Sequence, residues 1–170
     1  MHTPLIQALQ SFPKSTLPTG MQLFHGGRSK SPHCNETTKQ LSGTRKWLSQ
    51  SAEYAVSYAF NDIGELGSHL LWVCELQIDI PSLEGSQFSL IQVSPWTSSF
   101  PWDFPNAFHE YAKTVIPGNG SRALLDHKAN NLFKEILITE PVVAIKVVDV
   151  VVLPQNKPAA EALAFSRFNC

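Results

Sequence analysis

Two runs of β-branched and aliphatic residues near the end of the chain are the strongest constraint on its fold. They read KEILIT at residues 134–139 and VVAIKVVDVVVL at residues 142–153, and Glu140 and Pro141 separate them. Such runs favour strands, and a proline between them indicates a turn, because proline has no amide hydrogen to donate to a strand ladder. The sequence therefore predicts two late strands joined by a Pro-containing turn.

Shorter elements are predicted before and after these runs. Alternation of apolar residues predicts strands at residues 21–26, 46–49, 70–80 and 88–93, the first ending at a Gly-Gly pair and the third at Pro81. Helical spacing predicts helices at residues 4–11, 51–60, 107–113 and 158–168, and polar stretches predict loops at residues 28–44 and 116–131. Strand and helix do not alternate regularly. The pattern therefore predicts an α+β fold with a split antiparallel or mixed sheet and flanking helices.

The size and charge of the chain favour one domain without a bulk charge for binding nucleic acid or lipid, and a local basic patch for nucleic acid stays open. Its 170 residues and 18.8 kDa suit one domain, residues 1–170, with a core at about 21–153. Lys and Arg number 13 against 14 Asp and Glu, so the net charge of -1 supplies no overall field that would attract nucleic acid or anionic lipid. Neither a G-x-G-x-x-G motif nor a P-loop occurs, so the two usual nucleotide cradles are absent.

The cysteines and residues 1–15 indicate the kind of compartment in which the protein acts. Cys34, Cys74 and Cys170 are odd in number and far apart, and no Cys/His cluster occurs, so neither a disulfide framework nor a metal site is expected. Residues 1–15 lack the pattern of a cleaved leader, and no apolar stretch is long enough to span a bilayer. We expect action in a reducing, cytoplasmic compartment, without membrane contact; secretion into a target cell without a cleaved signal is compatible with this.

Three short segments contain residues that could take part in catalysis or ligand binding. They read LFHGGR at residues 23–28, WLSQSAEYAVSYA at residues 47–59 and FKEILI at residues 133–138. Each segment alone also has a structural explanation. A histidine in an apolar strand can be a buried structural residue, a serine before a helix can be an N-cap, and tyrosines four residues apart can belong to a core.

Glu135 is the residue that a purely structural explanation suits least. It lies in an apolar strand, and simple alternation puts it on one face with Phe133 and Leu137, opposite Lys134 and Ile136. A carboxylate in such a strand must either face solvent or be satisfied in a pocket, and its apolar neighbours on this face favour the pocket. This placement favours a functional role.

Taken in order, the three segments resemble the ADP-ribosyltransferase family, in particular its His-Tyr-Glu branch. The first strand contains a His-Gly pair, His25-Gly26, and the second leads into a Ser-containing turn and a helix with Tyr54. A late strand begins with a glutamate, Glu135, and is followed by a Pro-containing turn and a final strand. The resemblance implies a split NAD-binding β-sandwich in which NAD is a consumed substrate and no metal takes part.

The resemblance also implies roles for individual residues. Glu135 would stabilise the ribosyl cation, His25 would bind the adenosine ribose, and Gly26 would offer its backbone N–H and C=O to the nicotinamide carboxamide. Tyr54 would stack on the nicotinamide, with Tyr58 as the alternative one helical turn further on.

Three further residues complete the site that the resemblance implies. Arg28 would contact the diphosphate, and the Ser49 and Ser51 turn would line the NAD site.

Two positions depart from the family pattern. Trp47 lies where this branch commonly has a second tyrosine, and Phe133 lies where arginine-modifying members have Glu or Gln, so arginine is a less suitable acceptor.

The resemblance favours a mono-ADP-ribosyltransferase with a protein acceptor, of the kind found in toxins and secreted effectors. NAD glycohydrolase, RNA 2′-phosphotransferase and an inactive NAD- or ADP-ribose-binding module remain as alternatives.

Overall fold

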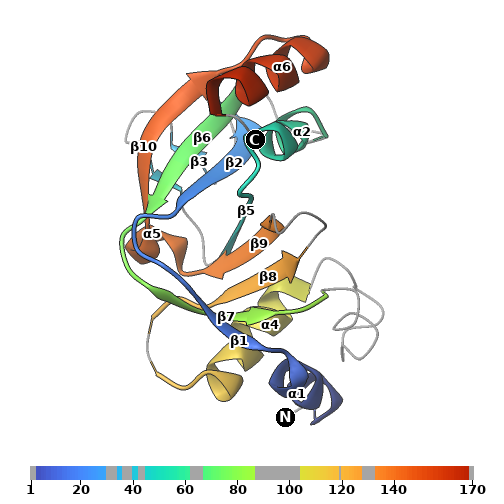
Figure 1. The fold of residues 1–170 in the computed structure, drawn as a ribbon, viewed down its shortest axis with the longest axis vertical. Coiled ribbons are helices and arrows are strands. Elements are labelled where there is room, and N and C mark those ends of the chain that lie inside the picture. The colour runs from blue at the N-terminus through green and yellow to red at the C-terminus, as the bar shows by residue number, and fades with distance from the viewer. Residues whose placement is uncertain are drawn as a thin grey trace.

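The fold consists of two β-sheets stacked end to end, each with its own pair of helices (Figure 1). The computed structural model describes residues 3–29, 34–35, 40–41, 45–61, 67–86, 104–118, 120–127 and 133–168. The five-stranded sheet has the order β1 (Lys14–Leu17), β7 (Ile80–Glu84), β8 (Ala123–His127), β9 (Phe133–Thr139) and β5 (Arg45–Leu48). The three-stranded sheet has the order β10 (Ile145–Val152), β6 (His69–Leu76) and β2 (Gln22–Arg28). Only the β7–β8 pair within these two sheets is parallel, so the predicted α+β class with a mixed, split sheet is confirmed.

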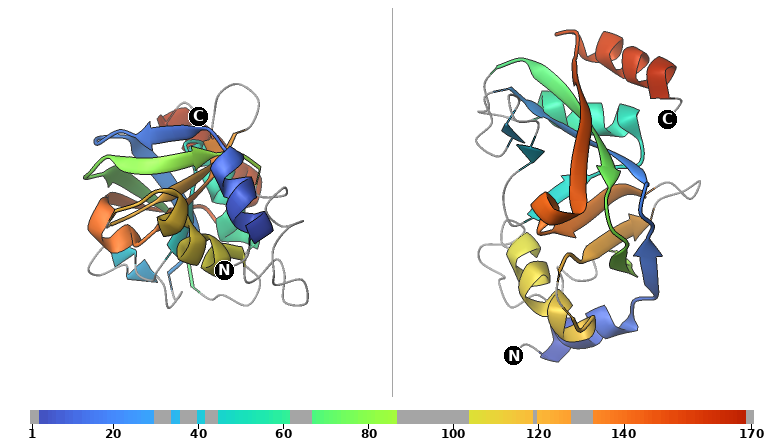
Figure 2. Two further views of the ribbon diagram at one scale, coloured as in Figure 1. Left: turned by 90° about the horizontal axis from the view of Figure 1, so that it is seen from below. Right: turned by 90° about the vertical axis from the view of Figure 1, so that its left-hand side faces the viewer.

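Helices cover the outer faces of both sheets (Figure 2). The helices α2 (Ala52–Asn61) and α6 (Lys157–Phe168) pack on the three-stranded sheet through a core that includes Phe24 and Ala55. The helices α1 (Thr3–Ser11) and α4 (Phe104–Val115) share a second core with the five-stranded sheet, including Leu124 and Leu137. A third core, which contains Trp72, joins residues of both sheets. A short pair of strands, β3 (Cys34–Asn35) and β4 (Gln40–Leu41), completes the described elements.

The two sheets meet at the end of β5. This strand pairs with β9 on one side, and on the other side the next residue, Ser49, forms a bridge with Phe24 of β2. The Phe24 N–H donates to the Ser49 carbonyl at 2.8 Å, and the Ser49 N–H donates to the Phe24 carbonyl at 2.9 Å. Segments that are remote in the chain are thereby brought to one place.

Two loop predictions and one strand prediction differ from the structure, and the first of these loops, at residues 28–44, contains the short strands β3 and β4. The predicted loop at residues 116–131 contains the strand β8, which has only the short apolar run Ala123–Leu125 as a local signal but lies buried between β7 and β9. Residues 142–144 were expected in a strand but belong to the helical turn α5 (Pro141–Ala144). Pro141 lies in the first turn of α5, where its fixed φ suits a helix and its missing N–H costs nothing. This turn carries the chain from the five-stranded sheet to the three-stranded one.

Two strand boundaries also differ from expectation. The first strand does not end at the Gly-Gly pair, because the β2–β6 ladder continues through Gly27 to Arg28. The strand predicted at residues 70–80 is two strands, β6 and β7, and Pro81 lies inside the second. Pairing of β7 with β8 begins only at Ser82, so this proline lies where β7 has β1 as its one neighbour. The strand predicted at residues 88–93 lies outside the described residues.

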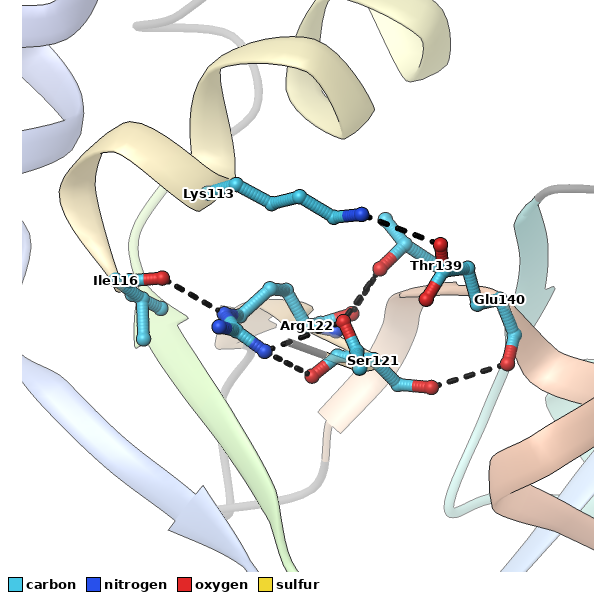
Figure 3. A network of polar contacts seen from close by, with 7 residues as sticks. Lys113, Ile116, Ser121, Arg122, Thr139 and Glu140 are labelled. Atoms are coloured by element: carbon cyan, nitrogen blue, oxygen red, sulfur yellow. Dashed lines mark hydrogen bonds and ion pairs between the residues drawn. The ribbon is translucent and has the colours of Figure 1, made fainter. Parts of the chain in front are cut away.

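A buried arginine closes the connection between α4 and β8 (Figure 3). The Arg122 side chain is 2% exposed and donates to the carbonyls of Ile116 and Ser121, each at 2.9 Å. Its backbone N–H donates to the Thr139 hydroxyl at 2.8 Å, and the Ser121 hydroxyl donates to the Glu140 carbonyl at 3.0 Å. These bonds join the start of β8 to the turn at which β9 leaves the sheet.

No helix in the described ranges has both the length and the apolar composition that crossing a membrane would require.

Candidate active site

The carboxylate of Glu135 accepts two hydrogen bonds from tyrosines of α2. The Tyr54 hydroxyl donates to Glu135 Oε1 at 2.7 Å, and the Tyr58 hydroxyl donates to the same oxygen at 3.2 Å. The tyrosines are one helical turn apart, and their rings meet edge to face, with centroids 5.5 Å apart. All three residues are partly buried, so the structure brings the predicted carboxylate and both predicted aromatic residues into one cluster.

Both tyrosines remain hydrogen-bond donors at neutral pH. Burial raises the pKa of the Tyr54 hydroxyl, and the negative charges of Glu135 and Asp126 raise it further. Burial also raises the pKa of the Tyr58 hydroxyl, with added contributions from its contacts with Tyr54 and Glu135. Two protonated phenols therefore orient the Glu135 carboxylate.

His25 faces β5 and is held in one tautomer. Its Nδ1 lies 2.7 Å from the Trp47 carbonyl oxygen. A carbonyl can only accept, so Nδ1 carries the proton and Nε2 carries the lone pair. Burial and, to a lesser extent, the positive charge of Lys46 lower the pKa of His25 to about 4, against a smaller opposite effect of the hydrogen bond to Trp47. The imidazole is therefore neutral at pH 7.

Gly26 combines an outward-facing backbone with a tight helix contact. The Phe24 N–H and C=O bond to Ser49, just after β5, and not to β6. Alternation along an antiparallel strand gives the N–H and C=O of Gly26 the same direction, toward the edge of β2 that lies away from β6. In the direction of a side chain, a Cβ at Gly26 would overlap the Ala55 carbonyl oxygen of α2. This glycine therefore allows α2 to rest directly on β2.

The turn between β5 and α2 is built by its two serines. The Ser51 hydroxyl accepts the Tyr54 N–H at 3.1 Å, which confirms the predicted N-cap. The Ser49 hydroxyl accepts the Ser51 N–H at 3.0 Å. Both side chains are buried at the start of the helix that carries the tyrosines, and a direct contact of either serine with NAD stays a prediction.

Arg28 lies three residues beyond His25, at the end of β2. Its Nε donates to the Gly67 carbonyl at 2.9 Å, and it pairs with His69 across the β2–β6 ladder. Among the described contacts, none joins Arg28 to Glu135, and His25 is connected to Glu135 through β5 rather than by a direct hydrogen bond. The contact of Arg28 with the diphosphate stays a prediction.

A second carboxylate, which the sequence pattern did not predict, belongs to this cluster. Asp126 of β8 lies directly opposite Glu135 of β9, so both side chains project from the same face of the sheet, and Asp126 is 7% exposed. The short apolar run at residues 123–125 was the one local signal for a strand before Asp126. It was missed because residues 116–131 were predicted as a loop. Lys46, buried beside His25, was also missed, because a lysine in a short strand is ordinarily exposed.

The predicted face of Phe133 is wrong. The β8–β9 ladder shifts register between Asp126 and His127, opposite the start of β9, and this shift breaks the simple alternation. Phe133 packs against the core that contains Ile136 and Ile138, not with the residues on the Glu135 face.

Within the ranges that the structure describes, no group of three or more His, Cys, Asp or Glu side chains lies together in a way that could hold a metal ion. Cys74 has a buried thiol that lies 3.8 Å from the Trp72 carbonyl oxygen.

Comparison with known proteins gives a structural likeness without a sequence match. No family model matches the chain, and no curated protein matches it. The fold is similar to that of a chain in the crystal structure of the M. tuberculosis MbcT-MbcA toxin-antitoxin complex, with a TM-score of 0.52 and 12% sequence identity over 98% of both chains. At that identity the likeness concerns the fold, and it extends over nearly the whole of each chain.

Proposed function

We propose that the chain is a single catalytic domain that cleaves NAD at the nicotinamide–ribose bond and transfers ADP-ribose to a protein acceptor. The observation that carries this proposal is the Glu135 carboxylate, held by the hydroxyls of Tyr54 and Tyr58 at 2.7 and 3.2 Å. A half-buried carboxylate oriented by two neutral donors is suited to stabilising positive charge nearby.

The chemistry of NAD cleavage requires such a group. When the bond between ribose C1′ and nicotinamide breaks, the nicotinamide takes the electron pair and leaves neutral, while the ribose becomes oxocarbenium-like. The acceptor hydroxyl, thiol or amine then forms a bond to C1′ and loses its proton. Glu135 would lie beside the ribose and stabilise its developing charge, with Tyr54 flanking the departing ring.

Binding of the dinucleotide would use the edge of β2. The outward N–H and C=O of Gly26 suit a carboxamide, which needs one donor and one acceptor. Nε2 of the neutral His25 would accept a hydrogen bond from a ribose hydroxyl. Arg28 would contact the diphosphate, where a guanidinium is a suitable partner.

Hydrolysis of NAD is the second candidate, and Asp126 favours it. Its carboxylate lies opposite that of Glu135 on the neighbouring strand and would accept the proton of an attacking water. The likeness to a chain of a toxin–antitoxin complex also supports a toxin role with a protein partner, for either reaction. Such a toxin would act where NAD is abundant, in the cytoplasm of its target cell.

The test is release of nicotinamide from NAD by the full-length protein. Glu135→Gln keeps an oxygen for the tyrosines but removes the charge, and we expect kcat to fall by about 10²- to 10³-fold. Glu75→Gln, at an exposed position of β6, is the matched control and should turn over normally. Equal rates in wild type and Glu135→Gln would contradict the proposal.

A second measurement separates the two candidates. Labelled NAD incubated with the protein and a cell lysate should leave label on protein if ADP-ribose is transferred. Release of nicotinamide with no labelled acceptor would assign hydrolysis, and binding of NAD without release would indicate an inactive binding module.

A further inference from the structure

Gln50 joins the turn after β5 to the first residue of β9. Its backbone N–H donates to the Phe133 carbonyl at 2.9 Å, and its side-chain Oε1 accepts the Phe133 N–H, also at 2.9 Å. The amide side chain thus replaces the backbone carbonyl that a paired strand would supply. Phe133 lies two residues before Glu135.

The regular pairing of β9 with β5 does not extend to the start of β9. The regular β5–β9 ladder ends at the pair Leu48 and Ile136, before it reaches Glu135. On its other edge, the regular β8–β9 ladder ends at the pair Asp126 and Glu135, and the register shifts just beyond it, before His127 pairs with Phe133. The carboxylate therefore lies at the last regular pair with β8 and beyond the end of the regular ladder with β5, and the two bonds from Gln50 fix the beginning of β9 just before it.

The same turn also begins the helix that carries the tyrosines. Ser51, the next residue, caps α2 by accepting the Tyr54 N–H at 3.1 Å. One turn is thus bonded to the strand of Glu135 through Gln50 and to the helix of Tyr54 through Ser51.

We propose that Gln50 is a positioning residue that keeps Glu135 in register with the two tyrosine hydroxyls. The inference rests on the proposed function for its effect on turnover. Its structural part, the coupling of Gln50 to the Tyr–Glu cluster, can be measured without any enzymatic activity.

The decisive variants are Gln50→Met and Gln50→Glu. Methionine has a similar length and no strong acceptor, whereas glutamate keeps an oxygen for the Phe133 N–H. Gln77→Met, the same substitution at an exposed position, is the control. All are made with Tyr111→Phe, which leaves Tyr54 and Tyr58 as the remaining two of the three tyrosines.

The first readout is ultraviolet titration of the tyrosines in the folded full-length protein. Displacement of Glu135 would withdraw a negative charge from both phenols, so Gln50→Met should ionise at lower pH than the background protein, while Gln50→Glu and Gln77→Met should not. A titration of Gln50→Met that coincides with the background would overturn the proposal. If Gln50→Met does not fold, Gln50→Asn, which is one methylene too short to reach Phe133, is titrated in its place with the same expectation.

The second readout is turnover of NAD. Gln50→Met should lower kcat about tenfold or more and change KM far less, because a misplaced carboxylate affects the reacting bond and not the rest of the ligand. Loss of kcat with unchanged tyrosine titration would overturn the positioning role. If the wild-type protein does not cleave NAD, the proposed function fails, and the titration still decides whether Gln50 positions Glu135.

Discussion

The imidazole of His25 is held as a neutral hydrogen-bond acceptor and not as a cation. Its Nδ1 proton is donated to the Trp47 carbonyl, and the neighbouring Lys46 charge disfavours a second proton. A ligand hydroxyl that meets Nε2 must therefore be the donor. At the scale of single residues, the candidate site contains a neutral histidine, two protonated phenols and a carboxylate, a combination that suits an uncharged sugar becoming a cation.

This state of His25 predicts a pH dependence of stability. The unfolded histidine binds its proton near pH 6.5 and the folded one only near pH 4, so between these values the unfolded chain holds more protons and stability falls as the pH is lowered. The full effect is about 3 kcal/mol. Urea unfolding of wild type and His25→Asn across this range measures it, since asparagine can donate to the Trp47 carbonyl but does not titrate. A difference between the two proteins that stays constant from pH 7 to about pH 4 would contradict the assigned state.

At the scale of elements, the contact between α2 and β2 sets where the tyrosines lie. Gly26 brings strand and helix together at backbone distance, and Ala52, Ala55 and Ala59 are buried on the same side of the helix. Small residues on both partners shorten the separation, because no side chain stands between the two backbones. The distance between Tyr54 and Glu135 thus depends on the missing side chain of Gly26 as well as on the small alanines of α2.

Gly26→Ala should test this contact. The added Cβ would overlap the Ala55 carbonyl oxygen, a backbone atom that cannot rotate away, so α2 must shift. We expect a loss of about 1–3 kcal/mol in the free energy of unfolding, together with weaker NAD binding. Gln22→Ala, at an exposed position of the same strand, is the control and should have little effect. Unfolding measured by urea with unchanged stability for Gly26→Ala would show that the helix does not rest on this glycine.

At the scale of the whole molecule, the chain passes between the two sheets at a few places, and the β9–α5–β10 passage is braced by Arg122. The guanidinium bonds to the carbonyls of the α4–β8 connection, while the Arg122 backbone and Ser121 bond to Thr139 and Glu140 at the end of β9 (Figure 3). This network lies at the end of β9 away from Glu135, so it supports the fold and not the site directly.

Arg122→Met should therefore destabilise the protein without rearranging the tyrosine cluster. Several backbone carbonyls would lose a charged donor while still buried, at a cost of about 3 kcal/mol or more. Arg122→Lys keeps the charge but cannot donate in as many fixed directions, so it should restore only part of this loss. Chemical denaturation measures the loss of stability. Tyrosine titration at denaturant concentrations below the unfolding transition measures whether the tyrosine cluster is unchanged. Equal stability of Arg122→Met and wild type would contradict the bracing role.

Local patterns were sufficient for much of the fold. Elements that depend on residues a few positions apart were predicted. They include the cap at Ser51, the helix α2 after it, strands before and after this helix, and the closing helix α6. The α+β class followed from the order of those elements. The resemblance implied that Glu135 and Tyr54 belong to one NAD site, and the structure brings these side chains together.

The tertiary structure alone decided the details that give the candidate site its chemistry. Asp126 faces Glu135 across the regular β8–β9 ladder, Phe133 turns to the other core where the register shifts beyond that pair, and Gln50 bonds to Phe133 from the turn after β5. Register is set by hydrogen bonds between residues far apart in the chain, and a one-residue slip reverses every face. Periodicity within a segment carries no information about that slip, so only the assembled sheets determine which side chains meet.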